Sequence, residues 1–312
     1  MAIDTDLPDT LDGQGGLFEI EDTPLPVSLA DRFVFPPFSV LDRRQGAWQD
    51  RKRAWMSMGF QSEIGRGEGL LLSSKNNDPV SQMLDVISSG TSVFDPVVAE
   101  LAYRWFSRPG DRVLDPFAGG SVRGLVASAL ARYYDGVELR EEQVIANRAQ
   151  EHLGSDIVPQ WIHGDARLMP TFLDGDYDMA MTCPPYADLE VYSDDPADLS
   201  AMDYDGHINA LATVLRDTYA LLRPDRFLVW VTSDVRKTTG GGDYRALVAD
   251  TIKLAQFAGF GLYNDAIIID PVGTTAIRSG KQFDATRKLG RSHQHMLIFV
   301  KGDGKVAGKR VL

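Results

Sequence analysis

Cys183 is the only cysteine in a chain of 312 residues, and it stands directly before Pro184, Pro185 and Tyr186. A thiol in this place can act as a nucleophile or as a hydrogen-bonding group. The two prolines restrict the backbone, so the carbonyl groups beside the thiol point in fixed directions. Tyr186 adds a flat ring on which a planar ligand can stack. We therefore take the segment TCPPY, residues 182–186, as a candidate catalytic site.

Three acidic residues at the ends of apolar runs form a second candidate site. Asp115 ends the run RVLD and precedes the turn PFAGGS, whose glycines let a ligand approach the backbone closely. Glu138 ends the next such run, where a carboxylate can accept hydrogen bonds from both hydroxyls of a ribose. Asp165 ends the third. Three acids would repel a pyrophosphate, so the pattern favours S-adenosylmethionine over NAD as the bound nucleoside.

Alternating strands and helices must position these residues. The pattern predicts strands at 112–115, 134–139, 160–165, 177–182, 227–234, 262–270 and 293–302. It predicts helices at about 47–58, 96–106, 122–133, 141–153, 205–222 and 244–258, the second of them capped by Asp95 with Pro96 in its first turn. Such alternation predicts an α/β fold with a mostly parallel, doubly wound sheet, whose last two strands pair as an antiparallel hairpin at one edge.

The net charge of −12 is unevenly distributed along the chain. Residues 1–31 contain eight acids and no Lys or Arg, which predicts an acidic, disordered tail. Two segments each have a net charge of +4 and are either solvated faces or contacts for nucleic acid. The first, residues 43–55, contains Arg43, Arg44, Arg51, Lys52 and Arg53 with Trp48 and Trp55 between them. The second, residues 272–292, is predicted to be a loop and contains Arg278, Lys281, Arg287, Lys288 and Arg291.

The composition argues against several classes of protein. No apolar run approaches the roughly 20 residues that a membrane-spanning helix needs, and the first residues lack the pattern of a secretion signal. We therefore expect a cytoplasmic protein without a membrane partner. A single cysteine excludes an internal disulfide and a zinc site built from cysteines. His293 and His295 could form a metal-binding pair, but no third ligand lies near them in the sequence, so no metal site is predicted.

Four segments follow one another at these strand ends, DPFAGGS, GVEL, GDA and TCPPY, and a fifth, TSVFDPVVAEL, comes just before the first of them. In this order they resemble the motifs of the S-adenosylmethionine-dependent DNA amino-methyltransferases, which act on N4 of cytosine or N6 of adenine. The resemblance covers about residues 91–300 and implies a Rossmann-like class I methyltransferase fold. TCPPY is nearest to the TSPPY variant of cytosine-N4 enzymes, so N4 of cytosine is the preferred target.

The resemblance also implies a role for each matching residue. Those implied to bind the cofactor are Phe94, Asp115, Pro116, Phe117, Ala118, Gly119, Gly120, Glu138, Leu139, Asp165 and Ala166. The implied catalytic residues are Cys183, Pro184, Pro185 and Tyr186. The target amine would donate to the side chain at position 183 and to the Pro184 carbonyl, while Tyr186 would stack on a base flipped out of the duplex. The ten basic residues of the two segments would contact DNA phosphates.

The implied organisation has three parts. Residues 1–31 form the tail, residues 32–90 a small basic and aromatic extension with a linker, and residues 91–312 the methyltransferase domain with the basic loop 272–292. Asp188, Glu190 and Tyr192 could line the base pocket, and Asp234 could face the active site or cap a helix. The sequence leaves the oligomeric state open between monomer and homodimer.

The chain departs from the family pattern at two places. Gly120 and Ser121 exchange their usual order, and Cys183 replaces Asp, Asn or Ser. Three interpretations of Cys183 stay open: a stand-in for Ser, a nucleophile that attacks a pyrimidine as in C5-methyltransferases, or a small buried residue in a protein with another or no activity. An RNA amino-methyltransferase, a protein-glutamine methyltransferase and a non-catalytic DNA-binding relative also remain possible.

Overall fold

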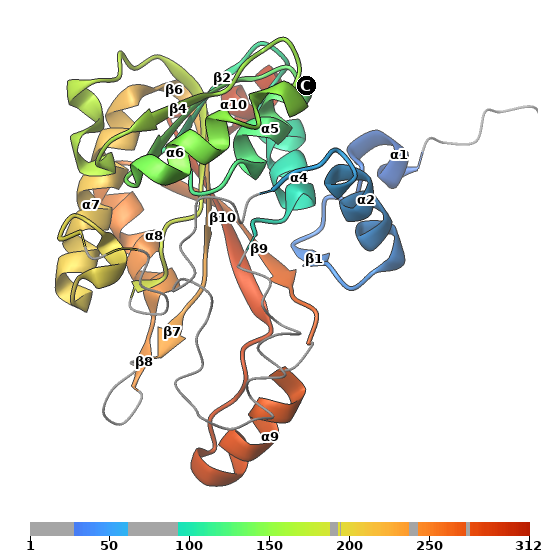
Figure 1. The fold of residues 1–312 in the computed structure, drawn as a ribbon, viewed down its shortest axis with the longest axis vertical. Helices are drawn as coiled ribbons and strands as arrows, with labels where there is room; N and C mark the ends of the chain where they lie inside the picture. Colours follow the sequence, from blue (N-terminus) through green and yellow to red (C-terminus); the bar gives the residue numbers. More distant parts are fainter. Residues whose placement is uncertain (1–27, 62–92, 188–192, 194, 237–242, 273–274) are drawn as a thin grey trace, which may run out of the picture.

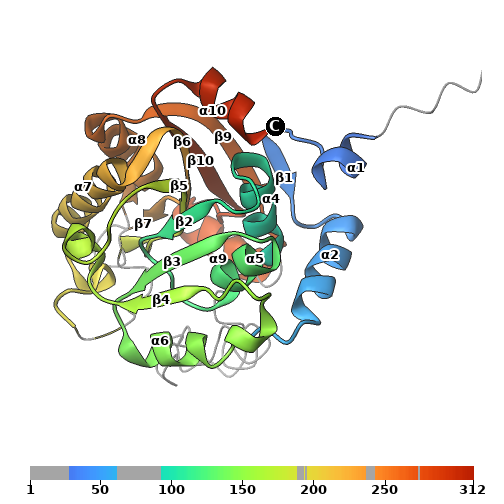
Figure 2. The same cartoon turned by 90° about the horizontal axis from the view of Figure 1, so that it is seen from above.

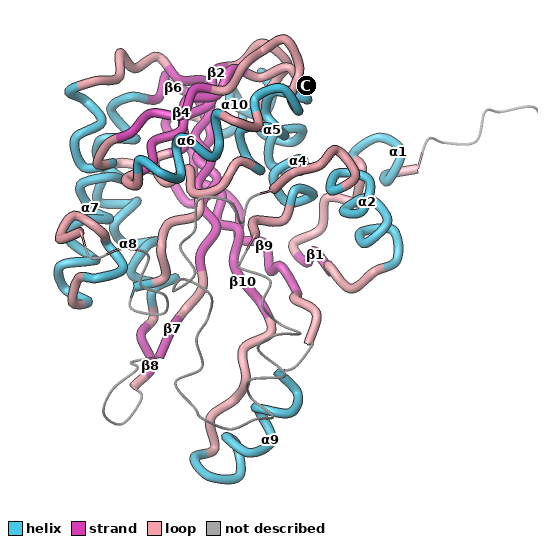
Figure 3. The backbone as a smooth tube through the Cα atoms, viewed as in Figure 1, coloured by secondary structure: helices cyan, strands magenta, loops and turns pink. Residues whose placement is uncertain are grey.

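The computed structural model of the chain describes residues 28–61, 93–187, 193, 195–236, 243–272 and 275–312. Its centre is an eight-stranded sheet in the order β1-β9-β10-β6-β5-β2-β3-β4 (Figures 1 and 3). The strands are β1 (Val40–Asp42), β2 (Arg112–Asp115), β3 (Tyr133–Glu138), β4 (Gln160–His163), β5 (Tyr177–Thr182), β6 (Leu222–Thr232), β9 (Gly261–Ile269) and β10 (His293–Lys301). Two further short strands, β7 (Val235–Arg236) and β8 (Tyr244–Arg245), pair with each other.

Helices connect most of these strands. The α-helices are α1 (Leu29–Phe33), α2 (Gly46–Met56), α4 (Pro96–Phe106), α5 (Val122–Ala129), α6 (Glu141–Arg148), α7 (Tyr204–Leu221), α8 (Leu247–Ala258), α9 (Thr275–Thr286) and α10 (Gly304–Val311). The short 3-10 helices are η2 (Glu151–Leu153), η3 (Ala166–Thr171) and η5 (Leu199–Ala201). Among the described residues, no helix is both long and apolar enough to cross a membrane.

The sheet has the predicted Rossmann-like, mostly parallel and doubly wound layout. Strand β10 runs antiparallel to β6 and β9, and the other neighbouring strands run parallel. Side chains alternate between two apolar layers, as a buried strand requires. In β6, for example, Val229 and Val231 pack with α4, α5, α6 and α10, whereas Leu228 and Trp230 pack with η3, α7 and α8 on the other face. Figure 2 shows α4 and α5 on one side of the sheet and α7 and α8 on the other.

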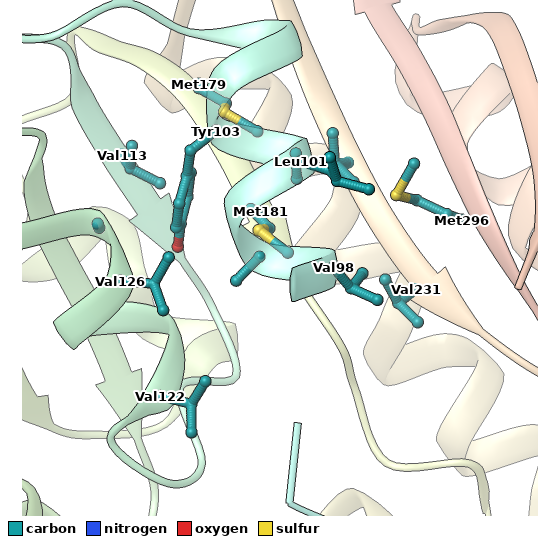
Figure 4. Packing of buried hydrophobic residues seen from close by; sticks show 14 of the residues in the cluster. Val98, Leu101, Tyr103, Val113, Val122, Val126, Met179, Met181, Val231 and Met296 are labelled. Carbon is teal, nitrogen blue, oxygen red and sulfur yellow. The ribbon is translucent and has the colours of Figure 1, made fainter. Parts of the chain in front are cut away.

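Helix α4 supplies the centre of the first layer. It begins at Pro96, with the Asp95 side chain accepting a hydrogen bond from the Val97 backbone amide, as the sequence predicts. Figure 4 shows Val98, Leu101 and Tyr103 of this helix packed among side chains of the sheet, all of them in one buried cluster. The helix is therefore fixed against the sheet, and Phe94 and Asp95 just before it have fixed places.

Several elements differ from the sequence prediction. Strand β1 was not predicted, because three residues are too few to show a periodic pattern; it pairs with β9, so the β9–β10 hairpin is not at the edge of the sheet. The segment 272–292, predicted as a loop, contains α9. The helix predicted at 122–133 ends at Ala129, since Ala131 has a positive φ of 61°.

The amino-terminal part of the chain docks on α4. Trp48 of α2 is 1% exposed and lies in the same cluster as α4, so it is a core anchor. Residues 29–31, placed in the predicted tail, begin α1, which Ser28 caps. Several predicted features lie outside the described residues. They are the tail up to residue 27, the part of the chain at 62–92 that includes the linker, and Asp188, Glu190 and Tyr192.

Candidate functional site

A cavity of about 1400 Å³ lies at the carboxyl ends of the parallel strands. In an open α/β sheet this is the edge where ligands bind. Its wall brings together residues that the sequence placed in separate motifs. Of the predicted cofactor and catalytic residues, the wall includes Phe94, Pro116, Phe117, Gly119, Gly120, Glu138, Leu139, Asp165, Ala166, Cys183, Pro184, Pro185 and Tyr186.

Asp115 has a different place from the one its motif implies. Its carboxylate is fully buried, and one oxygen accepts hydrogen bonds from Phe117 N at 3.1 Å and Thr182 Oγ1 at 2.7 Å. The other oxygen accepts from Arg123 Nε at 2.6 Å and Tyr134 OH at 2.8 Å. These donors use the acceptor capacity of both oxygens. Asp115 therefore shapes the glycine turn from beneath the cavity wall, and Ala118 beside it is buried as well.

Arg123 lines the cavity, although it is not among the predicted site residues. Its guanidinium is 5% exposed, pairs with Asp115, donates to the Ala118 carbonyl at 3.0 Å and lies over the Phe94 ring at 4.6 Å. Burial works to lower the pKa of Arg123, but Asp115, together with Tyr134 and Cys183, outweighs burial and the pKa is raised. The turn therefore rests on a charged, paired arginine, and the signal in the sequence was an arginine among the apolar residues of a predicted helix.

The glycine turn leaves room for a ligand at Gly119. This residue has a φ of 53°, which favours glycine, and a Cβ placed on it would meet nothing within 4 Å. Its amide donates to Glu138 Oε2 at 3.0 Å, and its carbonyl accepts from Asn147 Nδ2 at 2.7 Å. A side chain at position 119 would project into this open space while straining the backbone.

Glu138 is one of the acids on the cavity wall, and it lies beside the glycine turn. It ends β3, and it accepts hydrogen bonds from the backbone amides of Gly119 and Arg140, each at 3.0 Å. Burial raises the pKa of Glu138, although these amides and the Arg140 guanidinium act against the shift. A buried carboxylate gains when a ligand supplies hydrogen-bond donors, so Glu138 is well placed to accept from ligand hydroxyls.

Asp165 is held by its own neighbour. It caps η3 through the Arg167 backbone amide at 2.9 Å, and its carboxylate pairs with the Arg167 guanidinium at 2.6 Å. Part of the negative charge expected at this edge is therefore balanced within the chain. Phe94, Phe117 and Leu139 add apolar surface to the same region of the wall.

Cys183 lies in the cavity beside the hydroxyl of Tyr186. Its Sγ is 3.3 Å from Tyr186 OH, which also donates to Gln294 Oε1 at 3.2 Å. Cys183 is the residue after β5, and Gln294 is the second residue of β10, two strands away across β6. The part of the cavity around the TCPPY turn is thus assembled from segments far apart in the sequence, and Gln294 was not predicted to belong to it.

The first basic segment, residues 43–55, is tied mostly to the body of the protein. Arg43 pairs with Asp95 at 2.9 Å and Asp270 at 2.5 Å, and both Arg43 and Lys52 line the cavity. Arg51 pairs with Glu100, whose side chain is fully buried. The remaining two, Arg44 and Arg53, make exposed pairs with Asp42 and Asp50.

The second basic segment belongs to an arm between β9 and β10, whose described residues are 271–272 and 275–292. Figure 1 shows α9 at the far end of this arm, away from the sheet. Arg291, at its base, pairs with Asp234 at 3.1 Å and lines the cavity. Arg287 is mostly exposed and Lys288 is half-buried, while the side chains of Arg278 and Lys281 lie outside the described residues.

Asp234 both faces the cavity and accepts a hydrogen bond at the start of a helix, the two roles that the sequence left open. It lines the cavity, and its Oδ1 accepts from the Val248 backbone amide at 2.8 Å near the start of α8. Burial works to raise the pKa of Asp234, but hydrogen bonds from Tyr244, Val248 and Arg291 outweigh it and the pKa is lowered. Asp234 is therefore ionised and fixes the base of the arm.

His293 and His295 do not gather a metal site in the part of the chain that the structure describes. Their rings lie 5.5 Å apart, and His295 Nδ1 is 3.0 Å from Asp265 Oδ1. His293 lines the cavity, and burial, with help from Arg291, lowers its pKa. His293 is therefore a neutral imidazole on the cavity wall at neutral pH.

Comparison with known proteins gives similarity at the level of structure. No protein-family model matches the chain, and no curated protein matches its sequence. The structure is similar to TrmN from Thermus thermophilus, with a TM-score of 0.46 and 20% identity over 73% of this chain and 55% of that one. It is also similar to a TehB-like SAM-dependent methyltransferase from Corynebacterium glutamicum, with a TM-score of 0.41 and 14% identity over 71% of this chain and 95% of that one.

A third similar structure, also from Thermus thermophilus, is a protein that has been proposed to be a DNA modification methylase. Its TM-score is 0.34 and its identity 22%, over 45% of this chain and 52% of that one. This chain therefore spans only about half the length of TrmN and of that protein. At such identities the substrate must be inferred from the residues of the cavity.

Proposed function

We propose that this protein transfers a methyl group from S-adenosylmethionine to the exocyclic amine of a DNA base, with N4 of cytosine preferred over N6 of adenine. One observation supports this most directly: the TCPPY turn, the glycine turn and Glu138 line a single cavity. A cavity of about 1400 Å³ has room for a cofactor and a flipped base together.

The residues of the cofactor half fit S-adenosylmethionine. Glu138 is a carboxylate whose buried oxygens gain from ribose hydroxyls, and Gly119 leaves open space where any other residue would place a Cβ. Phe94 and Phe117 offer apolar faces. Once bound, this cofactor would supply an electrophilic methyl group; the protein itself would bind, orient and exclude water.

The residues of the target half fit a planar base that carries an amine. The Pro184 carbonyl and the Cys183 thiol would accept the two hydrogens of the amine, with the carbonyl as the stronger acceptor. Tyr186 would lie against the base, its hydroxyl held by Gln294. Positioning of this kind converts binding energy into the correct alignment for attack.

DNA would reach this cavity along the arm. Both the arm and the TCPPY turn leave the sheet at the edge where the cavity lies, because β9 and β5 run parallel to each other within the sheet. Arg287 and Lys288 of the arm would contact phosphates, whose charge dominates nucleic-acid affinity.

The test is product analysis. The purified protein is incubated with isotopically labelled S-adenosylmethionine and, separately, with duplex DNA, single-stranded DNA and RNA of mixed sequence, and each sample is digested to nucleosides for mass spectrometry. Label in N4-methylcytosine of DNA is the expected result. Label in N6-methyladenine would support methyl transfer to an exocyclic amine but would identify adenine as the target base. Label only in RNA, or no label in any sample, would contradict the proposal. A calorimetric titration with S-adenosylmethionine then separates a non-catalytic relative from a protein with no cofactor site.

Cys183 itself gives a second test, with Cys183→Ser as the variant. If the thiol stands in for Ser, the variant keeps or raises its activity, because a hydroxyl is the better hydrogen-bond acceptor. Loss of all activity together with 5-methylcytosine as the wild-type product would instead identify Cys183 as a nucleophile. Cofactor affinity, measured in parallel, shows that the variant is folded.

A further inference from the structure

Three strand ends converge where the amino-terminal part of the chain meets the cavity. Asp42 of β1 pairs with Ile269 of β9, so the next residues, Arg43 and Asp270, leave two parallel strands side by side. Gln294 of β10 pairs with Ile268 on the other side of β9. The sheet register therefore brings together residues that are more than 200 positions apart in the sequence.

A continuous series of hydrogen bonds joins these residues to the catalytic turn. Arg43 Nη1 donates to Asp270 Oδ1 at 2.5 Å, and Gln294 Nε2 donates to Asp270 Oδ2 at 3.3 Å. Gln294 Oε1 accepts from Tyr186 OH at 3.2 Å, and that hydroxyl is 3.3 Å from Cys183 Sγ. All five residues line the cavity.

Arg43 is itself fixed from several sides. Its Nε donates to Asp95 Oδ2 at 2.9 Å, its backbone amide donates to the Ile269 carbonyl at 3.2 Å, and its own carbonyl accepts from Gln49 Nε2 at 2.6 Å. The Arg43 side chain is 16% exposed and that of Asp95 only 3%. Two carboxylates, one at the start of α4 and one after β9, thus hold a single planar guanidinium.

We propose that Arg43 is a positioning residue of the target pocket, which acts through Asp270 and Gln294 to hold the Tyr186 hydroxyl beside Cys183. The inference rests on the proposed function, since the pocket is taken to receive the target base. It assigns Arg43 to the inside of the site in place of the phosphate contact that its basic segment suggested. The amino-terminal extension then contributes to the reaction without touching the substrate.

The geometry explains why this position needs arginine. Nε and Nη1 lie on a rigid fork and reach Asp95 and Asp270 at the same time. A lysine has one flexible ammonium group and cannot hold both carboxylates in fixed positions. Gln294 would then lose its fixed acceptor, and the Tyr186 hydroxyl could leave Cys183.

The single cysteine provides a direct readout of this arrangement. Alkylation of Cys183 by iodoacetamide, followed by intact-mass spectrometry, reports how often Tyr186 leaves the thiol, whatever the substrate. We expect Arg43→Gln and Gln294→Leu to raise the alkylation rate about fivefold, the change that the loss of one hydrogen bond produces in a local equilibrium. Arg43→Lys should raise it by a similar factor. Arg44→Gln, at the neighbouring residue whose exposed pair is with Asp42, should leave the rate unchanged.

Thermal unfolding of each variant shows that it is folded before the rates are compared. Equal alkylation rates in the wild type, Arg43→Gln and Gln294→Leu would overturn the proposal. So would an equal rise in Arg44→Gln, because that result would indicate a general loosening of the extension.

A double-variant series tests the route through Tyr186. In methyl transfer to DNA, Arg43→Gln should lower kcat about fivefold in the wild-type background and have no further effect in Tyr186→Phe, where the hydroxyl it positions is gone. Independent, multiplicative losses would mean that Arg43 does not act through Tyr186. If the wild type transfers no methyl group to any nucleic acid, the proposed function fails, while the alkylation rates still decide the positioning.

Discussion

The two basic segments have the same net charge in the sequence and different surroundings in the structure. Residues 43–55 lie against α4, where Arg43 and Arg51 meet the buried carboxylates of Asp95 and Glu100. The second segment belongs to the arm beyond the sheet, where Arg287 and its partner Asp284 are both mostly exposed. A charge paired with a buried carboxylate contributes to folding, whereas an exposed one is available to a partner.

Glu100 explains most of this difference. Its carboxylate is fully buried and accepts hydrogen bonds from Arg51, Trp55 and Arg104. Burial works to raise the pKa of Glu100, but these bonds outweigh it and the pKa is lowered. A buried, ionised glutamate requires cations beside it, and α2 provides one of them. The first segment is basic because it docks on acids.

The largest effect should follow from removing that docking interaction. Arg51→Met leaves Glu100 buried with fewer donors, so the free energy of unfolding should fall by about 2 kcal/mol. Urea unfolding followed by circular dichroism measures it. The matched control is Arg53→Met on the same helix, where only an exposed pair with Asp50 is removed and the change should stay below about 0.5 kcal/mol. Equal losses of stability in both variants would mean that the two pairs do not differ.

Charge reversal on the arm should affect DNA binding and not folding. The variant Arg287→Glu with Lys288→Glu should weaken binding to duplex DNA of any sequence about tenfold at low salt. The slope of log affinity against log salt should flatten by about 0.9 for each phosphate that the variant no longer neutralises. Fluorescence anisotropy over a salt series measures both quantities.

Reversal of Arg44 and Arg53 in the first segment provides the comparison for the arm variant. Those two side chains are exposed, but they lie on the part of the molecule that docks on α4, so we expect less than about a twofold change in affinity, the order of magnitude for screened surface charges. If the arm variant binds DNA as well as the wild type does, the arm is not the phosphate-binding region.

The smallest effect is the dependence of stability on pH. Because the folded pKa of Glu100 is below its ordinary value of 4.5, its contribution is fully present above that pH and is lost as the pH falls through the folded pKa. As the pH falls, the free energy of unfolding should decrease less in Arg51→Met than in the wild type, because Glu100 is held less strongly in the charged form in that variant. Arg287→Met should follow the wild-type curve, and a flattened curve for that variant would contradict the comparison.

The residues that we propose to bind the cofactor could be expected at one edge of the sheet from the sequence, because each of them belongs to a local pattern. The glycine turn, Glu138 and Asp165 each lie at or just after the end of a strand, and parallel strands bring their carboxyl ends to one edge. The role of Asp115 could not be predicted, because its four donors come from three other elements as well as its own turn. Arg123, which helps to bury that charge, was missed for the same reason.

The target half shows the opposite behaviour. TCPPY could be identified in the sequence as a rigid turn with a thiol and a ring. Its partners Gln294, Asp270 and Arg43 come from strand ends whose pairing no short motif predicts. Strand β1 is three residues long and α9 lies in a segment without a clear helical pattern, so neither could be expected. Their positions depend on pairing with β9 and on the path of the arm.

The sequence by itself determined the alternation of strands and helices, the sheet that follows from it, and the order of the acids and the thiol along one edge. These depend on local apolar periodicity and on turn chemistry, which act over a few residues. Only the tertiary structure decided which charges are internal. That choice depends on which carboxylates are buried opposite a given arginine, and the burial is set by contacts between residues far apart in the chain.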